Sequence, residues 1–249
     1  DVFDHEWLDV ALPPEIRRRL DGAPRSDPAT AERLYRDLVA GWQGRADDGP
    51  LLDPFCGAGT IAIEAAQLAC GIAPGLQRRF AFERLAPWRA HQAAWRELRE
   101  AAQSRVHASE VPIFAGDIAF RMTDFAARNA ERARVKGAIE FKTADALQRP
   151  PPAPRGTMVL NPPYGERIEA KGAGRQTIEG GASPAEFFAG LAAHWKRSYP
   201  GWTAWVLTPE MKLPTLMRLK ESQRVPLWNG PIECRLFRFD MVAGSARAI

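Results

Sequence analysis

The chain has 249 residues, of which 45% are hydrophobic and 26% charged, as is ordinary for one large globular domain or one domain with an appendage. No apolar run approaches the roughly 18 residues of a membrane span. The acidic opening DVFDHEWLDV lacks the apolar stretch of a signal peptide. We therefore expect no membrane association, and the net charge of +4 is compatible with a nucleic-acid partner without requiring one.

Cysteine and histidine usage gives no sign of a metal site. Cys56, Cys70 and Cys234 are scattered, and the four histidines are dispersed. Since neither set has the spacing of metal ligands, we expect reduced thiols, no bound metal and a cytoplasmic location.

Residues 1–45 are predicted to form a helical segment or a linker. In SDPATAERLYRDLVAGWQG, Asp27 is a candidate N-cap, Pro28 occupies the first helical position and Gly44 is a stop signal. The chain does not open with Met, so we expect it to be a piece of a longer protein.

From residue 46 to 249, strand and helix patterns alternate. Short apolar runs predict strands at 50–55, 111–117, 138–145, 157–164 and 203–208. Amphipathic runs predict helices at 60–70, 121–135, 183–199 (with a capping box of Ser183 and Glu186) and 210–220, the last interrupted by Pro214. VPLWNGPIECRLFRF predicts a hairpin around an Asn-Gly turn. The class is therefore α/β, with a doubly wound, mostly parallel sheet and a C-terminal antiparallel hairpin.

Residues 71–108 insert a basic helical arm with interleaved aromatics between the first helix and the second strand. Its Arg78 and Arg79 are candidates for contacts with RNA phosphates. The same pattern also fits an amphipathic helix that covers the sheet and buries Trp88 and Trp95.

The first candidate site is the turn in LLDPFCGAGTIAIEAA. A buried strand runs into Asp53, and Gly57 and Gly59 let the backbone turn sharply and approach a ligand. Thr60 opens a helix whose N-terminal amides favour an anionic group. GAGTIA also matches the weak dinucleotide pattern G-x-G-x-x-A, and a plain strand–helix turn is a further interpretation.

Two carboxylates follow later strands. Asp117 ends the strand VPIFAGD, where a carboxylate can accept hydrogen bonds from two ribose hydroxyls. Asp145 follows the third strand and has the chemistry to accept from an adenine amine. A helix N-cap for Asp117 and a surface turn for Asp145 are equally good interpretations.

The second motif is Asn161-Pro162-Pro163-Tyr164, at the end of the fourth strand. The Asn161 side-chain oxygen and a proline-held backbone carbonyl are two acceptors that can grip the two hydrogens of one planar amine. Tyr164 offers a flat face on which a base can stack. A Gly-rich charged loop follows at 165–183 and is long enough to be functional.

Together these motifs carry a resemblance. DPFCGAGT followed by NPPYGER resembles the class I AdoMet-dependent methyltransferases that modify exocyclic amines of bases. With IAPGLQRRFAFERL and NGPIECRLFRF added, the chain resembles the bacterial 23S rRNA guanine-N2 methyltransferases, which are often labelled N6-adenine-specific DNA methylases. The resemblance covers about residues 49–241. It implies a Rossmann-like methyltransferase domain over residues 46–249, without the RNA-binding THUMP domain that usually precedes it.

The resemblance also assigns roles to residues. The methionine end of AdoMet would lie against Asp53 and the glycine turn, its ribose against Asp117, and its adenine against Ile118 and Asp145. The implied cofactor site comprises Asp53, Pro54, Phe55, Cys56, Gly57, Gly59, Thr60, Asp117, Ile118, Asp145, Ala146 and Asn161. The implied catalytic residues are Asn161, Pro162 and Tyr164, and the implied substrate-binding residues are Pro163, Gly165, Glu166, Arg167, Arg78 and Arg79.

The implied reaction is a direct in-line transfer, in which the amine nitrogen attacks the methyl group of AdoMet and S-adenosylhomocysteine leaves. It needs no covalent intermediate, so Cys56 is interpreted as a small packing residue. The implied substrate is 23S rRNA, naked or in an early assembly intermediate, with the target base single-stranded or flipped out. No obligate protein partner is expected.

Three alternatives stay open. An N6-adenine methyltransferase acting on DNA or RNA would use the same Asn-Pro-Pro-Tyr motif. An NAD-type oxidoreductase fits GAGTIA but gives that motif no role. A non-catalytic RNA-binding module is disfavoured by the intact Asp53, Asp117 and Asn161.

Overall fold

The computed structural model describes residues 42–162, 183–229 and 232–242. Within them, seven strands form one sheet in the order β3-β2-β1-β4-β5-β7-β6. The strands are β1 (Leu51–Asp53), β2 (Ile113–Asp117), β3 (Ile139–Thr143), β4 (Gly156–Leu160), β5 (Trp202–Thr208), β6 (Gln223–Asn229) and β7 (Ile232–Asp240). The first five run parallel, and β7 is antiparallel to both β5 and β6. The predicted fold class is confirmed.

The strand order reverses at β1, which lies at the centre of the parallel strands. Leu51 pairs with Ile113 of β2 on one side and with Thr157 of β4 on the other. β2 and β3 then continue in one direction, and β4 and β5 in the other. In open α/β sheets, ligands bind outside the carboxyl ends of the strands at such a reversal.

Alternating side chains divide the core into two layers, one on each face of the sheet. Leu51, Ile113 and Val159 pack with one layer, whereas Leu52 and Phe114 on neighbouring positions pack with the other. Because successive side chains of a strand point to opposite faces, strands buried on both faces must be apolar throughout. The apolar runs of the sequence therefore report this doubly covered sheet.

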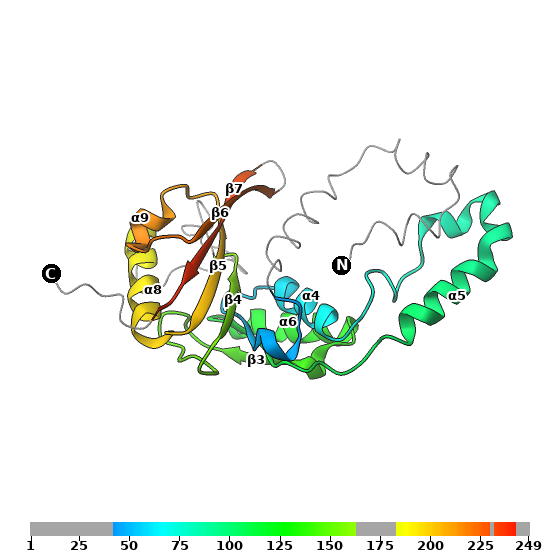
Figure 1. Ribbon diagram of the computed structural model, residues 1–249, viewed down its shortest axis with the longest axis horizontal. Helices are drawn as coiled ribbons and strands as arrows, with labels where there is room; N and C mark the ends of the chain where they lie inside the picture. Colours follow the sequence, from blue (N-terminus) through cyan, green and yellow to red (C-terminus); the bar gives the residue numbers. More distant parts are fainter. Residues whose placement is uncertain (1–41, 163–182, 230–231, 243–249) are drawn as a thin grey trace.

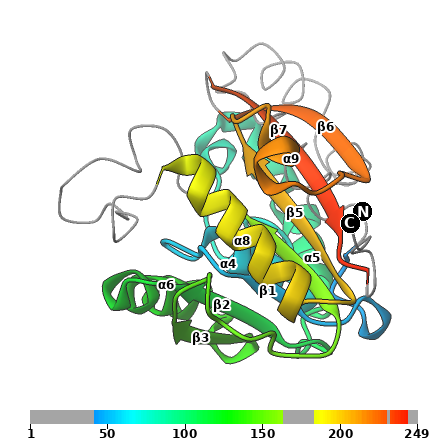
Figure 2. The same cartoon turned by 90° about the vertical axis from the view of Figure 1, so that its left-hand side faces the viewer.

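The helices are α4 (Thr60–Ala69), α5 (Gln92–Gln103), α6 (Phe120–Arg132), α8 (Pro184–Ser198) and α9 (Leu213–Met217), with the 3-10 turns η1 (Ala46–Asp48), η2 (Ala81–Arg84), η3 (Ala86–His91) and η4 (Lys136–Ala138). The layer built from α4 and α6 covers one face of the sheet, and that built from α8 and α9 covers the other (Figures 1 and 2). None of the helices in these described stretches is long and apolar enough to cross a membrane.

Local signals explain where two of these helices begin. The predicted capping box of α8 is confirmed, since the Ser183 hydroxyl accepts from the Glu186 amide at 3.3 Å and the Glu186 carboxylate accepts from the Ser183 amide at 2.7 Å. α4 begins after Gly59, and its buried face consists of alanines, which lets it approach the sheet closely.

Two details of the C-terminal region correct the sequence predictions. Pro214 does not interrupt a helix over 210–220, because α9 begins at Leu213 and holds Pro214 in its first turn, where no amide donor is needed. Asn229, predicted to be the first turn residue of the hairpin, is instead the last residue of β6 and pairs with Ile232. The residues between them lie outside the described part of the chain.

The arm, residues 71–108, departs most from expectation. Figure 1 shows α5 directed away from the sheet, so the interpretation that it covers the sheet is wrong. Trp88 and Trp95 are half-buried against each other and against Phe80 and Phe82, with ring centroids 5.1 to 6.0 Å apart. The arm thus has a small aromatic core of its own.

Candidate active site at the carboxyl edge of the sheet

The loop between β1 and α4 is tied to the end of β2 by backbone hydrogen bonds. The Cys56 amide donates to the Gly116 carbonyl at 2.7 Å, and the Gly59 amide donates to the Cys56 carbonyl at 2.7 Å. The Phe55 amide donates to the Asp53 carboxylate at 3.2 Å. These contacts fix the loop before any ligand binds.

Both predicted turn glycines have left-handed backbone angles, but for different reasons. Gly57 has φ +51°, and a Cβ placed there would meet no atom within 4 Å. Gly59 has φ +90°, and its Cβ would lie 3.0 Å from the Cβ of Ala126 on α6. Gly59 therefore permits close helix packing, while Gly57 leaves open space above the loop, where a ligand can approach the backbone.

Asp117 links this loop to the start of α6. It is fully buried, and its carboxylate accepts from the Gly57 amide at 3.1 Å and from the Ala119 amide at 2.9 Å. The second bond is a local turn contact, and the N-cap interpretation is wrong, because the N-cap of α6 is Ala119 and no side chain caps that helix. The ribose-binding role of Asp117 stays a prediction.

Asp53 ends β1 with only 1% of its surface exposed. Burial raises its pKa to about 8, and the nearby Asp117 adds to the rise, while the Phe55 amide and Arg149 act against it. Its Oδ2 atom is buried without a hydrogen-bond partner among the described residues. A buried carboxylate oxygen without a partner is costly unless a ligand completes it.

Asn161, at the end of β4, presents the same situation. Its Oδ1 atom is buried and has no hydrogen-bond partner within the described residues, and the following Pro162 is buried as well. Because β1 and β4 are adjacent parallel strands, Asp53 and Asn161 share the carboxyl edge at the reversal point. The structure thus places two acceptors that lack a partner in the described part of the chain at the position where a ligand is expected.

Arg149 is the functional candidate that sequence reasoning missed. It is 4% exposed, and its guanidinium lies over Gly116, where any side chain would collide with it. Burial lowers its pKa, and its charge acts on Asp53 and Cys56. Its backbone carbonyl accepts from the Tyr199 hydroxyl at 2.9 Å, which anchors the segment to the end of α8. Its Nη1 atom is buried without a hydrogen-bond partner among the described residues. Strands that end in Asp53 and Asp117 at one edge make a nearby cation favourable, but no local sequence pattern points to Arg149.

The other predicted cofactor residues surround this edge. Ile118 is 43% exposed directly after β2, so an apolar surface is available beside the site. The Asp145 carboxylate accepts from the Leu147 amide at 2.8 Å and from the Gln148 side chain at 2.9 Å. These local contacts are those expected if Asp145 is a surface-turn residue. Ala146 is buried in the layer of α8. An adenine-binding role for Asp145 stays a prediction.

Four residues of the glycine loop differ in what they expose. Pro54 is buried, and Phe55 packs edge-on against Phe187 with ring centroids 5.9 Å apart. Burial raises the pKa of the Cys56 thiol well above its usual range, which fits a packing residue better than a nucleophile. Thr60 is exposed at the start of α4.

The predicted substrate residues are divided. Pro163, Tyr164, Gly165, Glu166 and Arg167 lie outside the described residues. Arg78 and Arg79 belong to the arm, which leaves the domain after α4 and returns at β2. Its two ends are joined by a hydrogen bond of 3.0 Å from the His107 amide to the Cys70 carbonyl. These ends lie at the amino edge of the sheet, opposite Asp53 and Asn161.

No group of three metal-ligating side chains is found in the described segments.

Comparison with known proteins shows which proteins this chain resembles. The chain is 39% identical over 232 residues to a protein of Shewanella baltica (strain OS195) named ribosomal RNA large subunit methyltransferase K/L. The match covers 90% of this chain but 30% of the relative, so the chain spans about a third of the relative's length.

Two solved structures share the fold. A possible methylase from Clostridium difficile 630 is 28% identical, with a TM-score of 0.72 over 90% of this chain and 56% of the other. The structure of SMU.472 complexed with SAH is 23% identical, with a TM-score of 0.71 over 90% of this chain and 55% of the other, and shows the fold alone.

The family match covers the sheet, the arm and the carboxyl edge together. Residues 37–238 match the UPF0020 description "RMKL-like, methyltransferase domain". The resemblance predicted from the motifs is therefore confirmed, as is a fold of the class I AdoMet methyltransferases. The chain belongs to the RMKL-like methyltransferase domain family.

Proposed function

We propose that this chain transfers a methyl group from AdoMet to the exocyclic N2 amine of a guanine in 23S rRNA. The observation that carries the proposal is a pair of buried acceptors, Asp53 Oδ2 and Asn161 Oδ1, at the ends of two adjacent strands, which have no hydrogen-bond partner among the residues that the structure describes. Both ligands that the reaction brings together, a sulfonium amino acid and an aromatic amine, present N–H donors to such acceptors.

The residues present fit AdoMet. Asp53 would accept from its ammonium group, the open space above Gly57 would admit its methionine chain, and exposed Ile118 would cover one face of its adenine. Arg149 supports this arrangement because its charge favours the ionised form of Asp53. Bound AdoMet supplies a methyl group on positively charged sulfur, the activated form that an amine can accept.

The chain's own contribution is to hold the amine. Asn161 Oδ1 would accept one amine hydrogen, and the Pro162 carbonyl the other, so that the nitrogen lone pair points across the edge toward the cofactor. Fixing two reactants in line converts a bimolecular step into a unimolecular one. The same acceptors become stronger partners as the nitrogen gains positive charge. The buried, neutral Cys56 thiol takes no part.

The type of RNA is inferred from the name of a relative, and the methylated atom is inferred from the motif resemblance. The Shewanella baltica protein is named for large-subunit rRNA, which supports 23S rRNA as the substrate of this chain. Guanine N2, rather than adenine N6, rests on the motif resemblance. We place the reaction in the cytoplasm, on naked rRNA or an early assembly intermediate.

The test is a transfer assay. The chain is incubated with labelled AdoMet and deproteinised 23S rRNA, 16S rRNA or duplex DNA, and the product is digested to nucleosides. We expect label in N2-methylguanosine from 23S rRNA. Label in N6-methyladenosine would replace the proposal by the adenine alternative. Binding of AdoMet without transfer to any of the three would leave a cofactor-binding domain and overturn the proposed substrate.

A further inference from the structure

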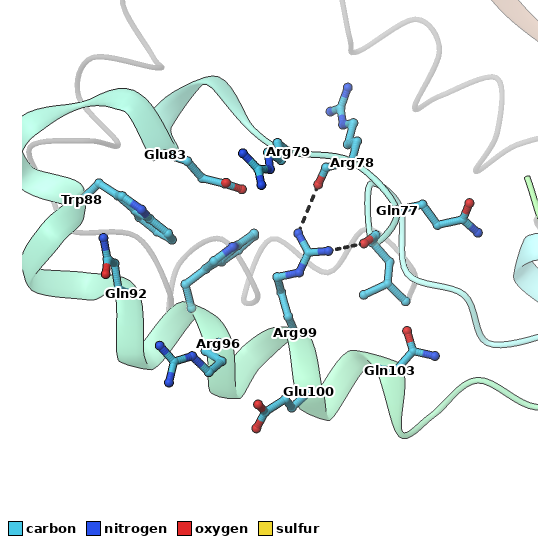
Figure 3. A pocket seen from close by; sticks show the side chains of 12 residues that line it. Gln77, Arg78, Arg79, Glu83, Trp88, Gln92, Arg96, Arg99, Glu100 and Gln103 are labelled. Atoms are coloured by element: carbon cyan, nitrogen blue, oxygen red, sulfur yellow. Dashed lines mark hydrogen bonds between the residues drawn. The ribbon is translucent and has the colours of Figure 1, made fainter.

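The arm carries a groove that the proposed transfer site does not use. The groove has a volume of about 880 Å³, and its lining comes entirely from residues of the arm between Leu76 and Gln103. Figure 3 shows Arg78 and Arg79 on the segment that forms one wall, opposite Arg96 and Arg99 of α5.

Charge is concentrated in this part of the molecule. Residues 71–108 contain seven arginines and three glutamates, which gives them a formal charge of +4, equal to that of the whole chain. The groove is lined by four arginines, of which Arg78, Arg79 and Arg96 are exposed, and by Glu83 and Glu100, so its lining keeps a net positive charge (four arginines minus two glutamates). Exposed arginines gathered around an open groove are the electrostatic pattern of a polyanion-binding surface.

Arg99 has a different task from its neighbours. Its guanidinium donates to the Leu76 carbonyl at 2.5 Å and to the Arg78 carbonyl at 3.1 Å. It therefore braces the wall from which Arg78 and Arg79 project. The wall is further tied to the domain by the Gln77 side chain, which donates to the Ala133 carbonyl at 2.9 Å. The groove is thus a built surface and not a loose loop.

Aromatic surface lies beside these cations. Trp88 and Trp95 line the groove and are only half-buried, although each contacts other aromatic rings. An indole with a free face can stack on an unpaired base, and a neighbouring guanidinium can do the same. Arginines for phosphates and indoles for bases together fit single-stranded nucleic acid better than an acidic peptide, which offers no bases.

We propose that the groove of the arm binds a single-stranded segment of the RNA substrate, away from the base that is methylated. The inference rests on the proposed function for the identity of the polyanion. It assigns Arg78, Arg79 and Arg96 to phosphates and Trp88 to a base. Because the arm is rooted at the edge of the sheet opposite Asn161, its contacts govern RNA affinity and not the transfer step.

The arm offers a charge-matched pair of variants for the test. Arg78→Gln with Arg79→Gln removes two charges from the groove, and Arg84→Gln with Arg89→Gln removes two exposed charges of the same arm that do not line it. Affinity of the full chain for a fluorescent, mixed-sequence single-stranded RNA is measured as a function of salt. We expect the groove variant to bind roughly five- to tenfold more weakly and to lose about 1.4 from its log–log salt slope, the value for two single-strand phosphate contacts.

The control variant should change affinity by less than about twofold, as expected for charges outside the contact surface. Equal losses in both variants, or no loss in either, would overturn the inference. Competition by an acidic peptide but not by RNA would replace RNA with a protein partner. AdoMet affinity of each variant reports that the domain is folded.

A second readout separates this inference from the proposed function. In transfer assays with 23S rRNA, the groove variant should raise KM and leave kcat unchanged. Wild-type chain that binds RNA through the groove but transfers no methyl group would disprove the proposed function and keep the groove. Methyl transfer with an unchanged KM in the groove variant would overturn the groove and keep the proposed function.

Discussion

The carboxyl edge of the sheet and the arm present polar groups in opposite ways. At the edge, Asp53, Asp117 and Arg149 are less than 5% exposed and act on one another at low dielectric. On the arm, Arg78 and Arg79 are exposed and screened by solvent. The first arrangement costs stability and offers a ligand an unsatisfied acceptor. The second costs little and offers attraction that depends on salt. The buried edge is suited to holding reacting groups, and the exposed arm is suited to attracting a charged partner.

The largest expected effect is at Asp53. Its pKa is raised to about 8 when folded, from 3.8. Between those pH values the unfolded chain ionises Asp53 and the folded chain does not, so stability falls as pH rises and levels off above about 8. Asp53→Asn should remove this loss and increase the free energy of unfolding by roughly a few kcal/mol above pH 8, with little change near pH 4. Urea denaturation at several pH values measures it.

Asp53→Asn should at the same time weaken AdoMet binding. Wild-type affinity should rise as pH increases through about 8, because the ionised carboxylate is the form that holds an ammonium group. Calorimetric titrations of the variant should lack that rise. Asp124→Asn on the exposed face of α6 controls for the loss of one charge. A variant that is no more stable at high pH and binds AdoMet normally would contradict the assignment of Asp53.

Asn161→Ala tests the edge without touching its charges. Loss of one acceptor aimed at the reacting amine should lower kcat by roughly 10²- to 10³-fold, or about 3–4 kcal/mol. AdoMet affinity should change little, since Asp53 and the glycine loop remain. Single-turnover transfer and calorimetry measure the two quantities separately. A large loss of AdoMet affinity would instead make Asn161 chiefly a cofactor residue.

Paired alanine substitutions at Gly57 and Gly59 distinguish ligand space from packing. Gly59→Ala combines a left-handed backbone with a Cβ contact of 3.0 Å to Ala126, so we expect a loss of about 2 kcal/mol in stability. Gly57→Ala has only the backbone strain, about 1 kcal/mol, but its Cβ enters the open space of the site. Gly57→Ala should therefore melt at a higher temperature than Gly59→Ala, whereas Gly59→Ala should bind AdoMet more tightly than Gly57→Ala. The reverse order would place the ligand elsewhere.

The smallest global effect is expected in the arm. Trp95→Ala removes the central ring of the aromatic cluster, but the arm contributes little to either core layer of the sheet. Hydrogen exchange should accelerate in α5, while the free energy of global unfolding changes by less than about 1 kcal/mol. Faster exchange in β1 and β2 as well would show that arm and sheet unfold as one unit.

The element pattern was predictable because both faces of the central strands are covered, which leaves a continuous apolar signal at β2, β4 and β5. The largest error concerns the arm, whose α5 does not cover the sheet. The other errors are local. The sequence predicts an interruption at Pro214, but proline is favoured in the first turn of a helix, where Pro214 lies in α9. Asn229 is not a turn residue as predicted, because it continues the β6 ladder and pairs with Ile232. The division of the chain at residue 45 stays a prediction.

The sequence by itself determined the α/β class, the glycine turn after β1, and the strand ends at which Asp53, Asp117 and Asn161 lie, because these depend on periodicity and local backbone demands. Only the tertiary structure decided that Asp53 is buried with an oxygen that lacks a partner among the described residues, and that Arg149 is buried over Gly116 and acts electrostatically on Asp53. It also decided that α5 is directed away from the sheet and that Arg78, Arg79 and Arg96 of the arm are exposed. The reason is that burial and charge pairing join residues far apart in the chain, and no local pattern encodes such neighbours.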